Sequence, residues 1–259
     1  MVDGLEARYL YCIIDAAEVV TFSTASVGRS GESVQLFPGT GMGVVMSRCL
    51  PPECTVNRDN MLNHQRVMEE AMTRFTVLPI RYGTIAEAAS QQEVESLVQR
   101  QLLEGRRHEL ERLLVDLRGK REMSVKVFWK DLDGVLKEIG QTDPEISHLA
   151  KRLAGKSEIA TRNERIRLGT LVQEKLRLRR EQLSQELFGA LVNTGSKSYS
   201  HALLGDRMVL NGAFLVPASE QPVFTDQLEQ LSVAHPELVF RCFGPMPPCS
   251  FVNLVISWN

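Results

Sequence analysis

The hydrophobic pattern divides the chain into two halves, each with strand-like and helical segments. The first half opens with short apolar runs of strand length, at residues 9–14, 19–22, 34–37 and 44–47. A helical pattern then begins after Asn57, a favourable N-cap residue. Thr84 and Ser90 are predicted N-caps of a short helix and of a long, leucine-rich helix that ends at Gly119. Residues 1–120 are therefore predicted to form an α+β domain that ends in a long helix.

The second half starts again with an alternating, strand-like pattern at residues 123–129. Helical patterns fill most of the following stretch, about residues 131–200, in which residues 157–193 contain no proline. Three further strand-like runs come later, the first two separated by a helical pattern, at residues 208–216, 238–243 and 251–256. This order is close to a ferredoxin-like α+β sandwich with a long helical insertion. The predicted fold class is α+β with two domains, the second spanning residues 121–259.

A stiff turn, residues 244–250, joins the last two predicted strands. Three prolines and a glycine in seven residues exclude a helix or a central strand. A stiff loop held by a sheet is a common place for function, and fixed φ angles reduce the entropy lost on binding. The predicted partner-binding residues are Gly244, Pro245, Met246, Pro247, Pro248 and Phe251. The alternatives are a turn with no partner, or a turn whose Met246 and Phe251 cap the domain's own core.

Composition narrows the class of protein. The chain has 259 residues, of which 43% are hydrophobic and 24% are charged, as is ordinary for a globular protein. The formal net charge of −2 gives no attraction to nucleic acid or to anionic membranes. No apolar run approaches the ~20 residues that span a bilayer. The first residues lack the pattern of a signal peptide, so a cytoplasmic location is expected.

The five cysteines are odd in number and irregularly spaced, which is not typical of a disulfide framework. Cys49, Cys54, Cys242 and Cys249 are too loosely spaced for a typical four-thiolate zinc site. We therefore expect buried thiols, with no disulfide and no bound metal.

Motifs of nucleotide binding and catalysis fit the chain poorly. Residues 39–43 and 195–198 contain glycines but lack the spacing and flanking elements of phosphate-binding loops. His64 is the one histidine in a suggestive setting, with Glu69, Glu70 and Arg81 near it in the sequence. A buried, hydrogen-bonded histidine that holds helix to strand is the favoured interpretation. The alternative is an enzyme or a nucleotide-dependent switch that uses the His64–Arg81 region.

Several segments resemble, in the same order, those of one protein family. They are residues 9–13, 64–70, 77–84, 125–129, 211–216 and 244–252. Together they resemble the gas vesicle accessory proteins of the GvpF/GvpL family over nearly the whole chain. Three positions depart from the family pattern: Met246 stands where tryptophan is common, Cys249 where tyrosine is common, and Gly212 where alanine is common. If the aromatic side chains of the turn contact a partner in the family, that contact is altered here.

The resemblance implies a non-enzymatic protein of gas vesicles, the hollow protein shells that give microbes buoyancy. The implied role is that of an assembly factor or a minor structural component, located at the gas vesicle. The implied partners are the main hydrophobic shell protein and other gas vesicle accessory proteins. No cofactor, small-molecule substrate, nucleic acid or lipid membrane is implied.

Overall fold

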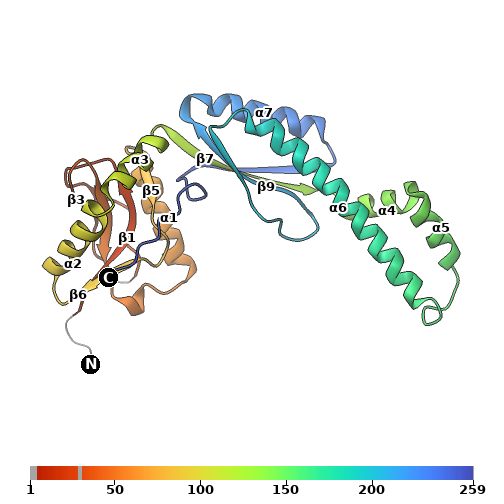
Figure 1. Ribbon diagram of the computed structural model, residues 1–259, viewed down its shortest axis with the longest axis horizontal. Helices are drawn as coiled ribbons and strands as arrows, with labels where there is room; N and C mark the ends of the chain where they lie inside the picture. Colours follow the sequence, from red (N-terminus) through yellow and green to blue (C-terminus); the bar gives the residue numbers. More distant parts are fainter. Residues whose placement is uncertain (1–4, 29–30, 259) are drawn as a thin grey trace. The chain divides into compact units, whose positions relative to one another are not determined.

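The computed structural model describes residues 5–28 and 31–258, and the chain divides into two units (Figure 1). The first break falls between Glu122 and Met123, and the second between Phe243 and Gly244. The sequence placed a boundary near residue 120 and all of residues 121–259 in the second domain. The structure instead groups the last residues, from Gly244 onward, with the first unit. The side chains that hold this C-terminal segment there are described below.

The first unit is built on an antiparallel sheet. Its six described strands are β1 (Glu6–Ile14), β2 (Thr21–Phe22), β3 (Val34–Pro38), β4 (Gly43–Arg48), β5 (Val77–Pro79) and β6 (Ile85–Ala88). The sheet order is β2-β3-β4-β1-β5, and β6 pairs with the first half of β1. Strand β1 is buried from Ala7 to Ile14, since β4 lies on one side of it and β5 and β6 on the other. The strands predicted in this half are confirmed.

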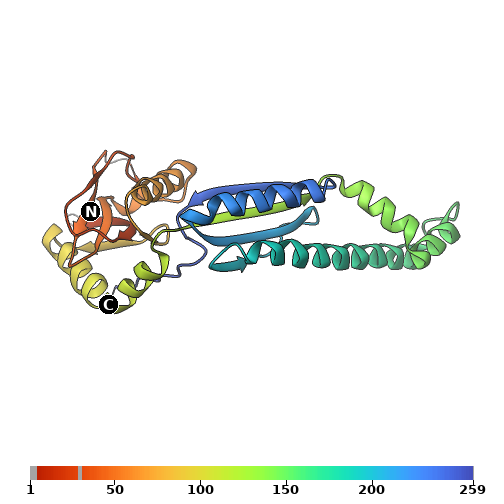
Figure 2. The same cartoon turned by 90° about the horizontal axis from the view of Figure 1, so that it is seen from above.

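Helices cover both faces of this sheet, as Figure 1 and Figure 2 show. Helix α1 (Arg58–Met72) begins at Asn57, whose side chain accepts a hydrogen bond from the Asn60 backbone, so the predicted N-cap is confirmed. The buried side of α1 packs against β1, and the shared core includes Tyr9, Tyr11, Val67 and Met68. The other helices are α2 (Gln91–Leu97), the π-helical segment η2 (Val98–Glu104) and α3 (Arg107–Leu117).

Two predictions in this unit are wrong. Thr84 does not cap a helix, because the residues after it form β6, whose backbone pairs with β1 from Glu6 to Tyr9. Ser90 does cap a helix, but the long helix is interrupted after Leu97. The chain continues as the π-helical segment η2, the Gly105 N–H donates to the carbonyl of Arg100, five residues earlier, and α-helical geometry resumes only at Arg107. In the first case, pairing to a distant strand overrides local helix propensity.

The second unit contains a four-stranded antiparallel sheet in the order β10-β7-β9-β8. Its strands are β7 (Lys120–Trp129), β8 (Lys197–Ser200), β9 (Met208–Pro217) and β10 (Leu238–Met246). Its helices are α4 (Leu132–Thr142), α5 (Pro144–Leu153), α6 (Arg162–Val192) and α7 (Gln221–Ala234), with the short 3₁₀ turn η3 (Ala218–Glu220) before α7. Trp129, Leu187, Phe214 and Phe224 lie at the centre of its core.

Two features of the second half of the chain differ from the sequence prediction. Strand β8, which lies where the helical insertion was expected to end, forms a hairpin with β9. Residues 251–256 were predicted to be a strand but pair with no strand of either described sheet. Their apolar pattern has another cause, because Leu254 is buried within the first unit while its neighbours Asn253 and Val255 are exposed.

We predict opposite effects for two glycine-to-alanine substitutions. Gly43→Ala places a Cβ 2.6 Å from the Phe37 carbonyl oxygen, so the β3–β4 hairpin must shift and the free energy of unfolding falls by about 1–3 kcal/mol. Gly169→Ala lies in the exposed interior of α6 with open space around its Cβ, and raises the free energy of unfolding by about 0.5–1 kcal/mol. Urea denaturation of both variants measures these changes. A Gly43→Ala protein as stable as the parent contradicts the predicted clash.

Candidate functional site

His64 lies in a buried cluster with three tyrosines. Its ring centre is 5.6 Å from that of Tyr9, 5.7 Å from that of Tyr11 and 5.5 Å from that of Tyr82. The Tyr9 hydroxyl is 2.9 Å from His64 Nδ1 and accepts a hydrogen bond from the Gly83 N–H. The Ile80 backbone also hydrogen-bonds the imidazole. The prediction of a buried, hydrogen-bonded His64 is confirmed.

Burial sets the charge state of this cluster. It lowers the pKa of His64 to about 4, which the hydrogen bond to the Ile80 backbone opposes only in part. Burial likewise raises the pKa of Tyr9 and of Tyr11. At neutral pH the imidazole is therefore uncharged and both phenols keep their protons. The groups act as internal hydrogen-bond partners.

The other residues that the sequence placed beside His64 serve different purposes. The Glu70 carboxylate accepts hydrogen bonds from the backbone N–H and the hydroxyl of both Ser23 and Thr24. Burial alone would raise the pKa of Glu70, but these four bonds outweigh it and lower the pKa to about 2. Glu69 accepts from Gln65 on the helix surface, and Arg81 is exposed. The structure therefore does not gather these residues around the imidazole.

The predicted partner-binding residues occupy the end of β10 and the segment after it. Gly244 and Pro245 are exposed, Met246 and Phe251 are half-buried, and Pro247 and Pro248 are buried. Strand β10 extends through Met246, so the first part of the predicted turn is strand. The accessible part of the predicted site is therefore short. It is followed directly by the buried prolines Pro247 and Pro248, which we call the buried anchor.

Three side chains hold this anchor and the rest of the C-terminal segment to the first unit. The buried Glu122 carboxylate accepts hydrogen bonds from the Ser250 N–H (2.8 Å) and hydroxyl (2.7 Å). Arg106 donates to the Val255 carbonyl, and the Trp258 indole N–H donates to the Ile85 carbonyl. Sequence reasoning missed these contacts, since they join residues 128 to 173 positions apart. Only the unusual position of Glu122, at the start of an apolar strand, gave a signal.

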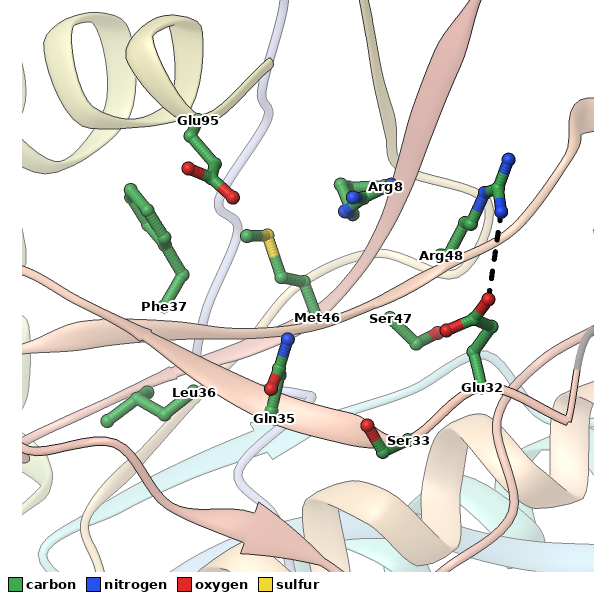
Figure 3. A pocket seen from close by; sticks show the side chains of 10 residues that line it. All are labelled: Arg8, Glu32, Ser33, Gln35, Leu36, Phe37, Met46, Ser47, Arg48 and Glu95. Carbon is green, nitrogen blue, oxygen red and sulfur yellow. Dashed lines mark ion pairs between the residues drawn. The ribbon is translucent and has the colours of Figure 1, made fainter. Parts of the chain in front are cut away.

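A small polar pocket lies over strands β1, β3 and β4 and beside α2 (Figure 3). Arg8 and Arg48 enter it from neighbouring strands, while Glu95 faces them from the helix. Both arginines pair with Glu6, at 3.0 and 3.3 Å, and Arg48 also pairs with Glu32, at 3.7 Å. The volume of about 80 Å³ is far below the ~300–1,000 Å³ of typical ligand sites. A nucleotide does not fit there, and the positive charges already have carboxylate partners.

The expectation that no disulfide forms is wrong for one pair of cysteines. Cys49 and Cys54 are joined by a disulfide across the short 3₁₀ turn η1 (Pro51–Glu53), and their Cα atoms are 6.4 Å apart. The expectation rested on the odd count, the loose spacing and the lack of a secretion signal, whereas a bond needs only one pair of cysteines brought together by local folding. Within residues 5–28 and 31–258, no three His, Cys, Asp or Glu side chains gather closely enough to hold a metal ion.

The fold defines a class of α+β proteins with two antiparallel sheets in separate units, and comparison with known proteins places the chain within a family. A family model described as gas vesicle synthesis protein GvpL/GvpF matches residues 7–253. The chain belongs to the GvpL/GvpF family and is a gas vesicle-related protein. The resemblance seen in the sequence is thereby confirmed. No helix in the described part of the chain combines the length and apolar composition that a membrane crossing requires.

Named relatives agree with this assignment. Gas vesicle protein F of Nostoc sp. strain PCC 7120 is 28% identical over 193 residues, which are 74% of this chain and 75% of that protein. Gas vesicle protein F of Microcystis aeruginosa is 24% identical over 250 residues, 95% of this chain and 98% of the relative. The crystal structure of GvpF from Anabaena sp. PCC7120 superposes with a TM-score of 0.81 at 25% identity, covering 97% of this chain and 100% of that one.

The His64 cluster predicts a specific pH dependence of stability. The pKa of His64 is lowered from 6.5 to about 4 on folding, so the unfolded chain binds the extra proton between these values. The stability that His64 contributes is full above pH 6.5 and is lost as pH falls toward 4. Over that range the parent should lose up to about 3 kcal/mol more than His64→Gln. Denaturant unfolding at several pH values checks this, and parallel pH profiles would contradict it.

We also predict that Glu122 keeps the C-terminal segment folded. Glu122→Gln retains the size of the side chain but replaces the carboxylate that Ser250 contacts twice. The free energy of unfolding should fall by about 1–2 kcal/mol, and hydrogen exchange at the Ser250 amide should accelerate. The exposed Glu229→Gln on α7 is the matched control, without either change. Unaltered exchange at Ser250 in Glu122→Gln would show that the segment is held by other contacts.

Proposed function

We propose that the chain is a non-enzymatic assembly factor or minor structural component of the gas vesicle, and that it binds the main hydrophobic shell protein. The observation that carries this proposal is the family match over residues 7–253. The relatives named above are themselves called gas vesicle protein F, which supports a role at the gas vesicle. An apolar shell subunit needs partners that cover its surface until it is incorporated.

The state of the titratable core supports a non-enzymatic role. A general base needs an accessible lone pair and a pKa near the working pH. The Nδ1 atom of His64 is engaged by the Tyr9 hydroxyl in a buried hydrogen bond, and burial holds the pKa of His64 at about 4. The alternative, an enzyme or switch that uses His64 and Arg81, requires the two side chains to lie close together. Arg81 is instead exposed and lies outside the His64 cluster.

The exposed end of β10 is the proposed contact for the shell protein. Gly244 and Pro245 are exposed, and Met246 adds a half-buried, adaptable thioether side chain suited to apolar partners. Pro247 and Pro248 are buried directly behind them, so the segment is fixed before binding. Little conformational entropy is then lost when a partner binds. Phe251 supports the same segment from its half-buried position.

We also propose that the two units are the domains of the protein, and that the second is ferredoxin-like. Its strands and helices follow the order β7, helices, β8, β9, α7, β10, which is the βαββαβ order of that fold. Helices α4, α5 and α6 fill the connection between β7 and β8, where a single helix is usual. This enlarged connection corresponds to the helical insertion expected from the sequence.

Met246→Asp tests the proposed contact. The side chain is only half-buried, so the variant should fold with a small change in melting temperature. Its binding to purified main shell protein should weaken by about tenfold or more, because a carboxylate must lose its water against an apolar surface. Met61→Asp, at an exposed position on α1, is the matched control and should bind normally.

Two results would contradict the proposed function. One is a folded Met246→Asp protein that binds the shell protein as tightly as the parent, which removes this segment from the contact. The other is a rise in melting temperature with a nucleotide, since a ligand that binds only the folded state stabilises it by mass action. That result would favour the switch or enzyme instead.

A further inference from the structure

The sheet of the second unit has one face filled by helices. Helices α6 and α7 pack on this face (Figure 1). The ring of Phe214 on β9 lies 5.3 Å from that of Phe188 on α6 and 5.5 Å from that of Phe224 on α7. Because side chains alternate along a strand, the residues next to Phe214 point to the opposite face.

The opposite face carries aromatic and cationic side chains. The hairpin register pairs Tyr199 with Ala213 and Lys197 with Leu215, which places both β8 residues on this face. On β7, Lys126 and Phe128 lie on this face, while Val127 between them points into the core on the helix-covered face. We call this surface the open sheet face, defined by Lys126, Phe128, Lys197, Tyr199, Arg241 and Phe243. Tyr199 is 54% exposed and Phe243 is 45% exposed, so large parts of two rings are accessible.

The charge on this face has a single sign. Strands β8, β9 and β10 and residues 123–129 of β7 contain no aspartate or glutamate. Their charged side chains are Lys126, Lys197 and Arg241. Lys126 Nζ lies 5.6 Å from the ring centre of Phe243, and the Arg241 guanidinium lies 5.7 Å from that of Phe128. In the described part of the chain neither of these two cations forms an ion pair with a carboxylate.

We propose that the open sheet face binds an acidic segment of a partner protein, in which carboxylates alternate with aliphatic side chains. Charge complementarity carries the proposal, because Lys126 and Arg241 are held over the rings of Phe243 and Phe128 and can still pair with a carboxylate. The exposed ring edges and the aliphatic stems of the lysines offer apolar area beside each charge. The proposal does not require the partner to be the shell protein, so it is tested separately from the proposed function.

Nucleic acid fits this surface less well. Single-stranded nucleic acids bind sheets through bases that stack on aromatic ring faces. Here Lys126 and Arg241 already lie over the rings of Phe243 and Phe128, so one face of each ring is occupied. The chain as a whole also has a net charge of −2, which opposes the attraction of phosphates. A carboxylate, in contrast, binds through the cations alone and does not need a free ring face.

Fluorescence anisotropy with the full-length protein tests the proposal. The probes are a labelled peptide of alternating glutamate and leucine, its lysine–leucine counterpart and a single-stranded RNA. We expect the acidic peptide to bind and the other two not to bind. The double variant Lys126→Glu/Arg241→Glu should weaken binding of the acidic peptide by about tenfold or more. Lys151→Glu, an exposed charge reversal on α5, is the matched control and should bind like the parent.

Other outcomes would overturn the proposal. They are no binding of the acidic peptide, binding that the double variant leaves unchanged, or preferential binding of the RNA. If the double variant has a lowered melting temperature, Lys126→Gln/Arg241→Gln replaces it, because it removes the charges without adding carboxylates. The neutral variant should also weaken binding, and the salt dependence of the remaining affinity should fall.

Discussion

The first unit depends on the need to satisfy the hydroxyl groups of two buried tyrosines. Tyr9 and Tyr11 are fully buried on β1, and a buried hydroxyl without a partner costs about 1–3 kcal/mol. Tyr9 bonds to His64 on α1 and to the Gly83 backbone. Tyr11 bonds to Ser47 on β4 and accepts from the Val27 N–H. One strand thus fixes a helix, a neighbouring strand and two loops, and the neutral His64 is part of that scaffold.

The same requirement explains the path of the C-terminal segment. Glu122 is 3% exposed, and a buried carboxylate needs donors close to it. The backbone N–H and hydroxyl of Ser250 supply two, so the chain after β10 returns to the first unit. Pro247 and Pro248 are buried on the way, and they have no N–H that would need an acceptor. Their carbonyls accept hydrogen bonds from the Cys249 and Phe251 N–H groups. The two prolines fix the backbone φ angles directly after the exposed end of β10.

Local signals in the sequence predicted local structure well. Asn57 and Ser90 mark helix starts because their side chains bond to backbone only three residues away. Pairing between distant segments was not predictable in the same way. Strands β6 and β8 are short and form only because they pair with β1 and β9. Residues 251–256 have a strand-like pattern but pair with no strand in the described sheets. The buried state of His64 followed from its helix pattern, whereas the bonds to Tyr9 and Ile80 required the fold.

Strand β10 carries both candidate surfaces, and their different chemistry follows from its sequence. Arg241 and Phe243 alternate onto the open sheet face, where their neighbours are Lys126 and Phe128. The next residues, Gly244 and Pro245, have no charge and lead to Met246. A cationic, aromatic face selects carboxylates beside apolar groups, while a short apolar strand end selects an apolar surface. The two surfaces can therefore recognise different features of a partner without competing for the same side chains.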